Sequence, residues 1–214
     1  MNELVNMLIK NGNLPVLFTF NDFKKIGFQK SEYLKELKEG LDKKYIDCVY
    51  NEIYTLNIKY RERAIPKRML SQMIVPDSYI SMYYVLYDYG WIPEMIFSVT
   101  SVTVKENYMI DTNGYGTFIY TPLYEKMPTA GICVKKDFQG EYKMAKPLRA
   151  LCDQLYFTSK EWPWSLLNIY ENFRIFPDLL EENLTGNDFD ELQGTFGVKN
   201  IENFLKEIRK ELAL

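Results

Sequence analysis

Cationic side chains crowd one short stretch of the chain. Residues 59 to 68 read KYRERAIPKR, which places five cations around a single acid: Lys59, Arg61, Arg63, Lys67 and Arg68, with Glu62 among them. Lysine and arginine at this density can contact several successive phosphates of a nucleic acid. The alternative interpretation is a solvated linker helix between two domains, because charged runs often only keep a surface in water.

Charge is also divided unevenly along the chain. The 214 residues carry a net charge of −3, yet residues 1 to 70 hold 13 Lys and Arg against 9 Asp and Glu, and residues 71 to 214 hold 13 against 20. The first part is therefore net +4 and the remainder net −7. This asymmetry predicts that the N-terminal part meets a polyanion such as DNA, while the rest has another role.

The residue types argue against catalysis. Histidine, the commonest general base and metal ligand, does not occur, and neither does a phosphate-binding loop, a dinucleotide motif or a nucleophile elbow. Cys48, Cys133 and Cys152 lack the spacing of a zinc site or a disulfide framework. We expect no enzyme activity, no metal and no cofactor. The alternative is a carboxylate- or lysine-based enzyme, but the paired aspartates with which a nucleotidyltransferase holds magnesium are not visible.

Three short helices are expected to position the first cations. Apolar residues recur at helical spacing from Leu4 to Ile9, and Asn11-Gly12-Asn13 is expected to end that helix. Thr19 is the expected N-cap of a second helix, which Gly27 closes. Residues 29 to 39 predict the third, with Gly40 as its end. Its inward residues would be Tyr33, Leu34, Leu37 and Leu41, and its outward residues Ser31, Glu32, Lys35, Glu36 and Glu39.

A change of period follows the third helix. From Tyr45 the pattern alternates, and Asn51-Glu52 separates YIDCVY from IYTL as the turn of a β-hairpin. Three helices followed by a β-ribbon are typical of a winged helix-turn-helix, whose third helix enters the DNA major groove. The N-terminal end of that helix, Gln29 to Ser31, suits base edges better than its glutamate-rich middle does. The candidate DNA-binding residues are Lys24, Lys25, Gln29, Lys30, Ser31, Lys35, Lys43, Lys44, Arg61, Arg63, Lys67 and Arg68.

The rest of the chain predicts a second domain. We expect an α+β protein: a winged helix-turn-helix over 1–60, a basic linker helix over 61–76, and a mixed α/β domain over 77–214 with a small, mostly antiparallel sheet and a helical C-terminus. Residues 78 to 91 predict a helix, and strands follow in IFSVTSVTV, NYMI, TFIYTPL, GICVKKD and EYKMAK. Pro147 should start another helix, and SLLNIYENFRIF and NIENFLKEIRKEL predict two more.

The C-terminal part is acidic and suggests a second kind of surface. From Glu161 to Val198 there are eight acids and one cation, Arg174. Such a region would avoid DNA and would face either a basic protein or solvent. The N-terminus MNELVNMLIK has no secretory pattern, and no stretch is apolar enough for a membrane span, so we expect a cytoplasmic protein without a membrane partner.

Several motifs together resemble one protein family. The segments SYISMYYVLYDYGWIPEMIFSVTSVT, GYGTFIYT and MAKPLRALCDQLYF are similar to the middle and C-terminal part of the AbiEi-type antitoxins of bacterial type IV toxin–antitoxin and abortive-infection systems. The expected winged helix upstream, ending in IYTL, is similar to the N-terminal domain of that family. The resemblance covers roughly residues 4 to 157.

The resemblance implies a function. It implies a transcriptional autorepressor that binds inverted repeats in its own promoter, as two copies on the DNA, and an antitoxin that counteracts a nucleotidyltransferase-like toxin, with direct contact to the toxin left open. The alternative that we retain is a protein-interaction module that does not bind DNA and uses its acidic C-terminal domain to hold a partner.

Overall fold

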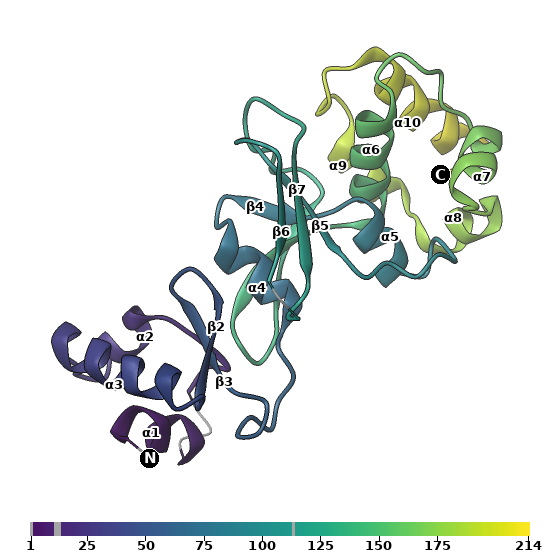
Figure 1. The fold of residues 1–214 in the computed structure, drawn as a ribbon. Helices are drawn as coiled ribbons and strands as arrows, with labels where there is room; N and C mark the ends of the chain where they lie inside the picture. Colours follow the sequence, from purple (N-terminus) through teal and green to yellow (C-terminus); the bar gives the residue numbers. More distant parts are fainter. Residues whose placement is uncertain (1, 11–13, 113) are drawn as a thin grey trace.

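The computed structural model describes residues 2–10, 14–112 and 114–214, and its class is α+β. It contains a small antiparallel sheet, a larger mixed sheet and a group of helices at the C-terminal end (Figure 1). The two sheets and the C-terminal helices follow one another along the chain and in space (Figure 1). The expected α+β class is confirmed.

The N-terminal part alternates helices and short strands. Its elements are α1 (Glu3–Lys10), β1 (Leu17–Phe18), α2 (Phe20–Lys24), α3 (Lys30–Asp42), β2 (Ile46–Tyr50) and β3 (Ile53–Leu56). The strands form an antiparallel sheet in the order β1-β3-β2. The three helices and the sheet enclose a core of their own, whose buried residues include Leu4, Val5, Phe18, Phe23, Tyr33, Leu37 and Ile46.

Local signals predicted this part well. The Thr19 hydroxyl and the Asp22 carboxylate form a reciprocal capping box at the start of α2. Asn51 and Glu52 form the hairpin turn, in which Asn51 adopts a left-handed φ of 46°. The expected end of the first helix at 11–13 lies outside the described residues.

Two expectations about α3 were wrong. Gly40 does not end the helix, which continues to Asp42. A Cβ at Gly40 would lie 2.6 Å from Cδ1 of Ile46, so this glycine lets β2 approach α3 closely. Leu34 does not point inward, because its side chain is 50% exposed and the core is filled by Tyr33 and Leu37.

The larger sheet has six strands and is mixed. Its strands are β4 (Ser78–Ile80), β5 (Val99–Thr103), β6 (Tyr108–Asp111), β7 (Thr117–Pro122), β8 (Ile132–Lys136) and β9 (Glu141–Ala145), in the order β6-β7-β5-β4-β9-β8. The β5–β7 and β4–β9 pairs are parallel and the others antiparallel. The sheet is therefore larger and less antiparallel than expected.

The helix expected over 78–91 is shorter. Residues 78–80 form β4 in the middle of the sheet, and only α5 (Tyr83–Asp88) is helical. Tyr79 pairs with Val102, and Ile80 pairs with Ser101 on one side and with Met144 on the other. These partners are distant in sequence, and their backbone hydrogen bonds override the helical spacing of the side chains.

Helices complete the second part. The structure has α4 (Lys67–Ile74), α6 (Pro147–Thr158), α7 (Leu166–Phe173), α8 (Pro177–Asn183), α9 (Gly186–Leu192) and α10 (Lys199–Glu211). The helices α6, α7 and α10 confirm the expectation, whereas α8 and α9 were not anticipated. Residues 61–66 are not helical, so the expected linker helix begins only at Lys67, where α4 packs on the larger sheet through Leu70 and Ser71.

The second face of the small sheet is covered by the rest of the protein. Leu17, Val49 and Ile53 belong to the core of the larger part. The Gln139 side chain accepts hydrogen bonds from the backbone N–H of Val16 and Leu17, at 2.8 and 3.1 Å, and donates one to the carbonyl of Leu17. Figure 1 shows the β2–β3 hairpin between α3 and the larger sheet, so α3 faces away from the larger part.

No helix among the described residues is both long and apolar enough to cross a membrane.

Candidate nucleic-acid interface

The end of α2 and the start of α3 carry a cluster of exposed polar and cationic side chains. Lys24 ends α2 and Lys25 follows it, while Gln29 is the N-cap of α3 and Lys30 and Ser31 are its first residues. All five are exposed. They lie at the edge of the molecule that is remote from the larger sheet (Figure 1).

The outward face of α3 differs from the one that sequence spacing predicted. Tyr33, Leu37 and Gly40 are buried, which fixes the inward direction. With 3.6 residues per turn, the opposite side carries Ser31, Lys35, Lys38 and, as the last residue of the helix, Asp42. All four are exposed. Lys38 was not among the residues expected to face outward, although it lies four residues after Leu34, whose side chain is exposed, and five after the buried Tyr33.

Two of the three glutamates of α3 are engaged elsewhere. The Glu36 carboxylate accepts a hydrogen bond from the backbone N–H of Leu4 in α1, at 3.4 Å, and is only partly exposed. Glu39 forms an ion pair with Lys43 at 2.6 Å, and this hydrogen bond lowers the pKa of Glu39. Of the three glutamates only Glu32 is exposed without a described ion pair, and the helix also ends in the exposed Asp42. The glutamates therefore lie beside the outward face, and Asp42 lies at its C-terminal end.

Lys43 and Lys44 lie far from Lys30. They follow the last turn of a 13-residue helix, which is about 20 Å long at 1.5 Å per residue. The tip of the hairpin lies at the other end, where Glu52 and Lys30 line the same hollow of about 70 Å³. The hairpin therefore has Lys43 and Lys44 at its base, as their place in the sequence implies, and a glutamate at its tip.

The basic connection from β3 to α4 packs against the larger part. Arg61 lies over the ring of Tyr115, with 5.9 Å between its Cζ and the ring centroid, and Arg63 lies 5.5 Å from the ring centroid of Phe138. The Tyr115 hydroxyl donates to Asp47 of β2 at 2.7 Å. These contacts use the two arginines to join the two parts, although Arg63 is still exposed.

Arg68 has an internal role. Its guanidinium forms an ion pair with Asp88 and donates hydrogen bonds to the hydroxyls of Tyr84 and Tyr142, at 3.3 and 3.4 Å. The charge of Arg68 is already paired with Asp88, and three of its five N–H donors are used within the protein. We therefore remove Arg68 from the candidate DNA-binding residues, while its exposed neighbour Lys67 stays among them.

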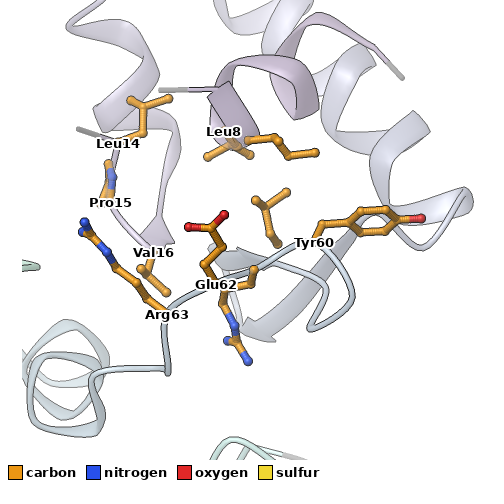
Figure 2. Close-up of a pocket in the computed structure, with 10 residues that line it drawn as sticks. Leu8, Leu14, Pro15, Val16, Tyr60, Glu62 and Arg63 are labelled. Atoms are coloured by element: carbon orange, nitrogen blue, oxygen red, sulfur yellow. The ribbon is translucent and has the colours of Figure 1, made fainter. Parts of the chain in front are cut away.

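A hollow of about 120 Å³ lies between α1, β1 and the basic connection. Its lining includes Leu8, Leu14 and Val16, with Arg61 and Glu62 from the connection. Figure 2 shows the Glu62 carboxylate directed into it. Glu62 is the one carboxylate in this lining, and its other charged residues are Arg61 and Arg63, so the hollow has no set of ligands for a metal and we assign no chemistry to it.

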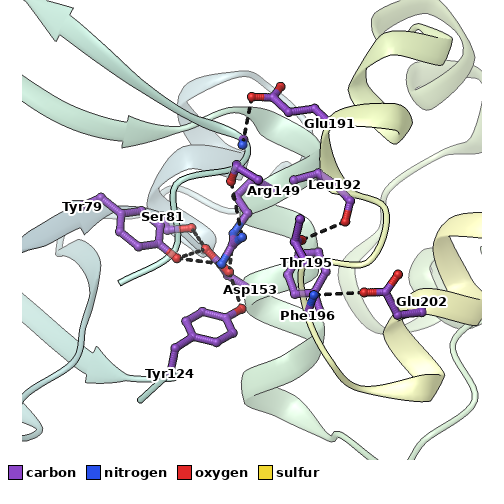
Figure 3. Close-up of polar contacts among 12 residues, drawn as sticks. Tyr79, Ser81, Tyr124, Arg149, Asp153, Glu191, Leu192, Thr195, Phe196 and Glu202 are labelled. Carbon is purple, nitrogen blue, oxygen red and sulfur yellow. Dashed lines mark hydrogen bonds and ion pairs between the residues drawn. The ribbon is translucent and has the colours of Figure 1, made fainter. Parts of the chain in front are cut away.

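A polar network is buried at the start of α6 (Figure 3). Arg149 and Asp153 have no exposed side-chain surface and form an ion pair at 2.8 Å. One carboxylate oxygen of Asp153 also accepts from Tyr124 at 2.7 Å, and the other accepts from Tyr79 and Ser81 at 2.9 and 2.6 Å. Both oxygens are therefore fully used.

The surroundings of Arg149 keep its guanidinium protonated and positively charged. Burial alone would lower the pKa of Arg149, but the charge of Asp153 and the nearby tyrosines outweigh it and leave the pKa raised. The Phe196 ring covers the guanidinium at 4.6 Å. Burial, and then the Asp153 charge, raise the pKa of Tyr79 and of Tyr124. These phenols stay neutral donors, so the network is suited to holding α6 on the sheet rather than to proton transfer.

Sequence reasoning missed this network. The one available signal was the spacing of Arg149 and Asp153, which lie i and i+4 on an otherwise apolar helix face. Within the described ranges, no group of three or more Cys, Asp or Glu side chains is arranged to hold a metal ion.

Comparisons with known proteins add no identification. No protein-family model matches the chain, and no curated protein sequence matches it.

Proposed function

We propose that the protein is a DNA-binding transcriptional autorepressor and the antitoxin of a bacterial type IV toxin–antitoxin system. The order helix, strand, helix, helix, hairpin, with a three-stranded antiparallel sheet, supports reading residues 2–56 as a winged helix-turn-helix. The observation that carries the proposal is the outward face of α3, where Ser31, Lys35 and Lys38 project, with the exposed Asp42 at the far end of the helix.

The proposed complex follows from the placement of these side chains. The start of α3 would enter the major groove, where Gln29 and Lys30 can meet base edges. Lys35 and Lys38 would contact the phosphates on one side of the groove, and Lys24 and Lys25 those on the other. Two copies would bind the two halves of an inverted repeat.

A binding assay tests the DNA part of the proposal. The probe is a labelled duplex from the region upstream of the protein's own gene, and its affinity is measured by fluorescence anisotropy at several salt concentrations. Wild-type affinity should fall steeply with salt, with a slope near −0.9 per neutralised phosphate in the double-logarithmic plot.

The double variant Lys35→Ala/Lys38→Ala should weaken binding about tenfold and reduce that slope by about 2, because two phosphate contacts are lost. The matched control is Lys199→Ala/Lys206→Ala, which removes two exposed lysines from α10 at the other end of the protein. Equal affinities of the two double variants, or salt-insensitive binding of the wild type, would contradict the proposal.

The antitoxin part needs a cellular test. The partner would be a nucleotidyltransferase-like protein encoded by the adjacent gene. Co-expression of the two should relieve the growth arrest caused by the neighbour alone. If rescue persists in the Lys35→Ala/Lys38→Ala variant, neutralisation and DNA binding belong to different parts of the chain. Absence of rescue by the wild type would remove the antitoxin assignment.

A further inference from the structure

An exposed apolar surface lies on α7 and α8. We call it the α7–α8 patch and define it by the residues that line a hollow of about 420 Å³: Leu166, Leu167, Tyr170, Phe176 and Pro177. Leu167 is 64% exposed, Phe176 56% and Tyr170 44%. Single exposed apolar residues are ordinary, but a contiguous group that lines a hollow marks an interaction site.

The chain path produces this patch. Ile169 and Phe173 fill the inward side of α7, which leaves Leu167 and Tyr170 to project outward. Arg174 then takes a left-handed conformation with φ of 55°, and this reversal brings Phe176 back against Tyr170, with 5.1 Å between ring centroids. The two aromatic rings support each other, so the hollow is formed before any partner arrives.

Unpaired carboxylates lie on the two helices that carry the patch. Glu171 of α7 and three acids of α8, Asp178, Glu181 and Glu182, are exposed, and none of the four forms an ion pair with another described residue. By contrast, Glu191 is paired with Lys146 and Asp190 with Arg209. The cation of this region, Arg174, is engaged by Glu94 at 3.2 Å. The patch is therefore an apolar hollow with a net negative rim.

We propose that the α7–α8 patch binds a basic amphipathic helix of a partner protein. Such a helix presents apolar side chains at i, i+3 and i+4 to a hollow of this kind, and its flanking lysines or arginines complement the carboxylates. A second copy of this chain fits less well, because a symmetric contact would set the acidic rim against itself. The patch lies at the opposite end of the molecule from α3, so the two surfaces act independently (Figure 1).

The first test uses a designed probe and the full-length protein. The probe is a fluorescein-labelled helical peptide of about 18 residues with leucine at i, i+3, i+4 and i+7 and lysine at its flanks. Its twin carries glutamate in place of every lysine. Anisotropy titration should give saturable, micromolar binding of the lysine peptide and at least about tenfold weaker binding of the glutamate peptide. Equal binding of the two peptides, or no saturation by the lysine peptide, overturns the proposal.

Variants then assign the binding to the patch. Leu167→Ser and Glu181→Lys/Glu182→Lys should each weaken binding of the lysine peptide about tenfold or more. The control is Val134→Ser on the edge strand β8, whose side chain is 63% exposed and lies in a different element. An equal loss in Leu167→Ser and in Val134→Ser overturns the proposal. So does wild-type self-association that Leu167→Ser abolishes, because the occupant would then be a second copy.

The variants also separate this inference from the proposed function. All substituted side chains are exposed, so each variant should unfold in urea at the same midpoint as the wild type. An unchanged midpoint excludes misfolding as the cause of lost binding. DNA affinity should not change in Leu167→Ser. If the protein does not bind DNA but binds the lysine peptide through Leu167, the proposed DNA-binding function is refuted. The proposed binding site at the α7–α8 patch is then retained.

Discussion

Replacing Asp153 by asparagine would test the buried network most directly. The substitution keeps the shape of the side chain and removes its charge. One oxygen can still accept from Arg149 and Tyr124, but the new amide nitrogen cannot accept from Tyr79 or Ser81. The Arg149 guanidinium, which has no exposed surface, is left as an unpaired buried charge.

The expected loss is large. Breaking a buried ion pair by removing one partner costs about 3–5 kcal/mol, against a total stability of about 5–15 kcal/mol for a typical domain. Two buried tryptophans, Trp91 and Trp164, are 2% and 3% exposed and report on the unfolding of this part. Urea unfolding followed by tryptophan fluorescence should therefore show a clear decrease in the midpoint for Asp153→Asn.

Two comparisons make the interpretation specific. Asp190→Asn, which removes an exposed ion pair with Arg209, should change stability by less than about 1 kcal/mol. Arg149→Met added to Asp153→Asn should be no less stable than Asp153→Asn alone, because the unpaired charge is then gone. If the free energy of unfolding of Asp153→Asn lies within about 1 kcal/mol of that of the wild type, the network does not stabilise the fold.

Two further predictions concern the small sheet. Gly40→Ala should destabilise the protein by about 1 kcal/mol, because overpacking against Ile46 costs about 1–3 kcal/mol and the gain in helix propensity is only about 1 kcal/mol. Ile46→Val removes the Cδ1 atom that the new Cβ would meet, so the double variant should regain stability. Urea unfolding measures both effects. Burial, and then the hydrogen bond to Asp47, raise the pKa of Tyr115 to about 12 from an ordinary 10.0. The folded state thus favours the neutral phenol of Tyr115. The stabilisation that this phenol gives to the folded state is complete below pH 10 and is lost as pH rises through about 12. Thermal unfolding should show the wild-type advantage over Tyr115→Phe shrinking across that range, and a constant difference would contradict it.

Several elements whose signals lie within a few residues were predicted correctly, although α8 and α9, which begin with Pro177 and with a Thr185–Asp188 capping box, were not anticipated. The Thr19–Asp22 capping box, the Asn51-Glu52 turn and the helix start at Pro147 each depend on adjacent residues. The strand at 78–80 was missed because its partners in β5 and β9 are remote in the chain. Gly40 was misread as a helix end because its role depends on Ile46, which only the packed hairpin brings against it.

The sequence by itself determined the sign and the position of the charge. It placed the excess of cations in the first third of the chain and the excess of acids toward the C-terminus, because net charge depends on composition alone. It also placed Lys24, Lys25 and Lys30 near the start of the third helix, which begins at Lys30.

Only the tertiary structure decided which charges are available. Arg68 forms an ion pair with Asp88 and hydrogen bonds with two tyrosine hydroxyls, and Lys43 forms an ion pair with Glu39. Lys38 lies exposed on the outward face of α3. Arg149, for which the sequence offered only its spacing to Asp153, is fully buried with that carboxylate. The reason is physical: an ion pair or a buried charge depends on the distance between side chains and on their removal from water, and packing between distant segments sets both.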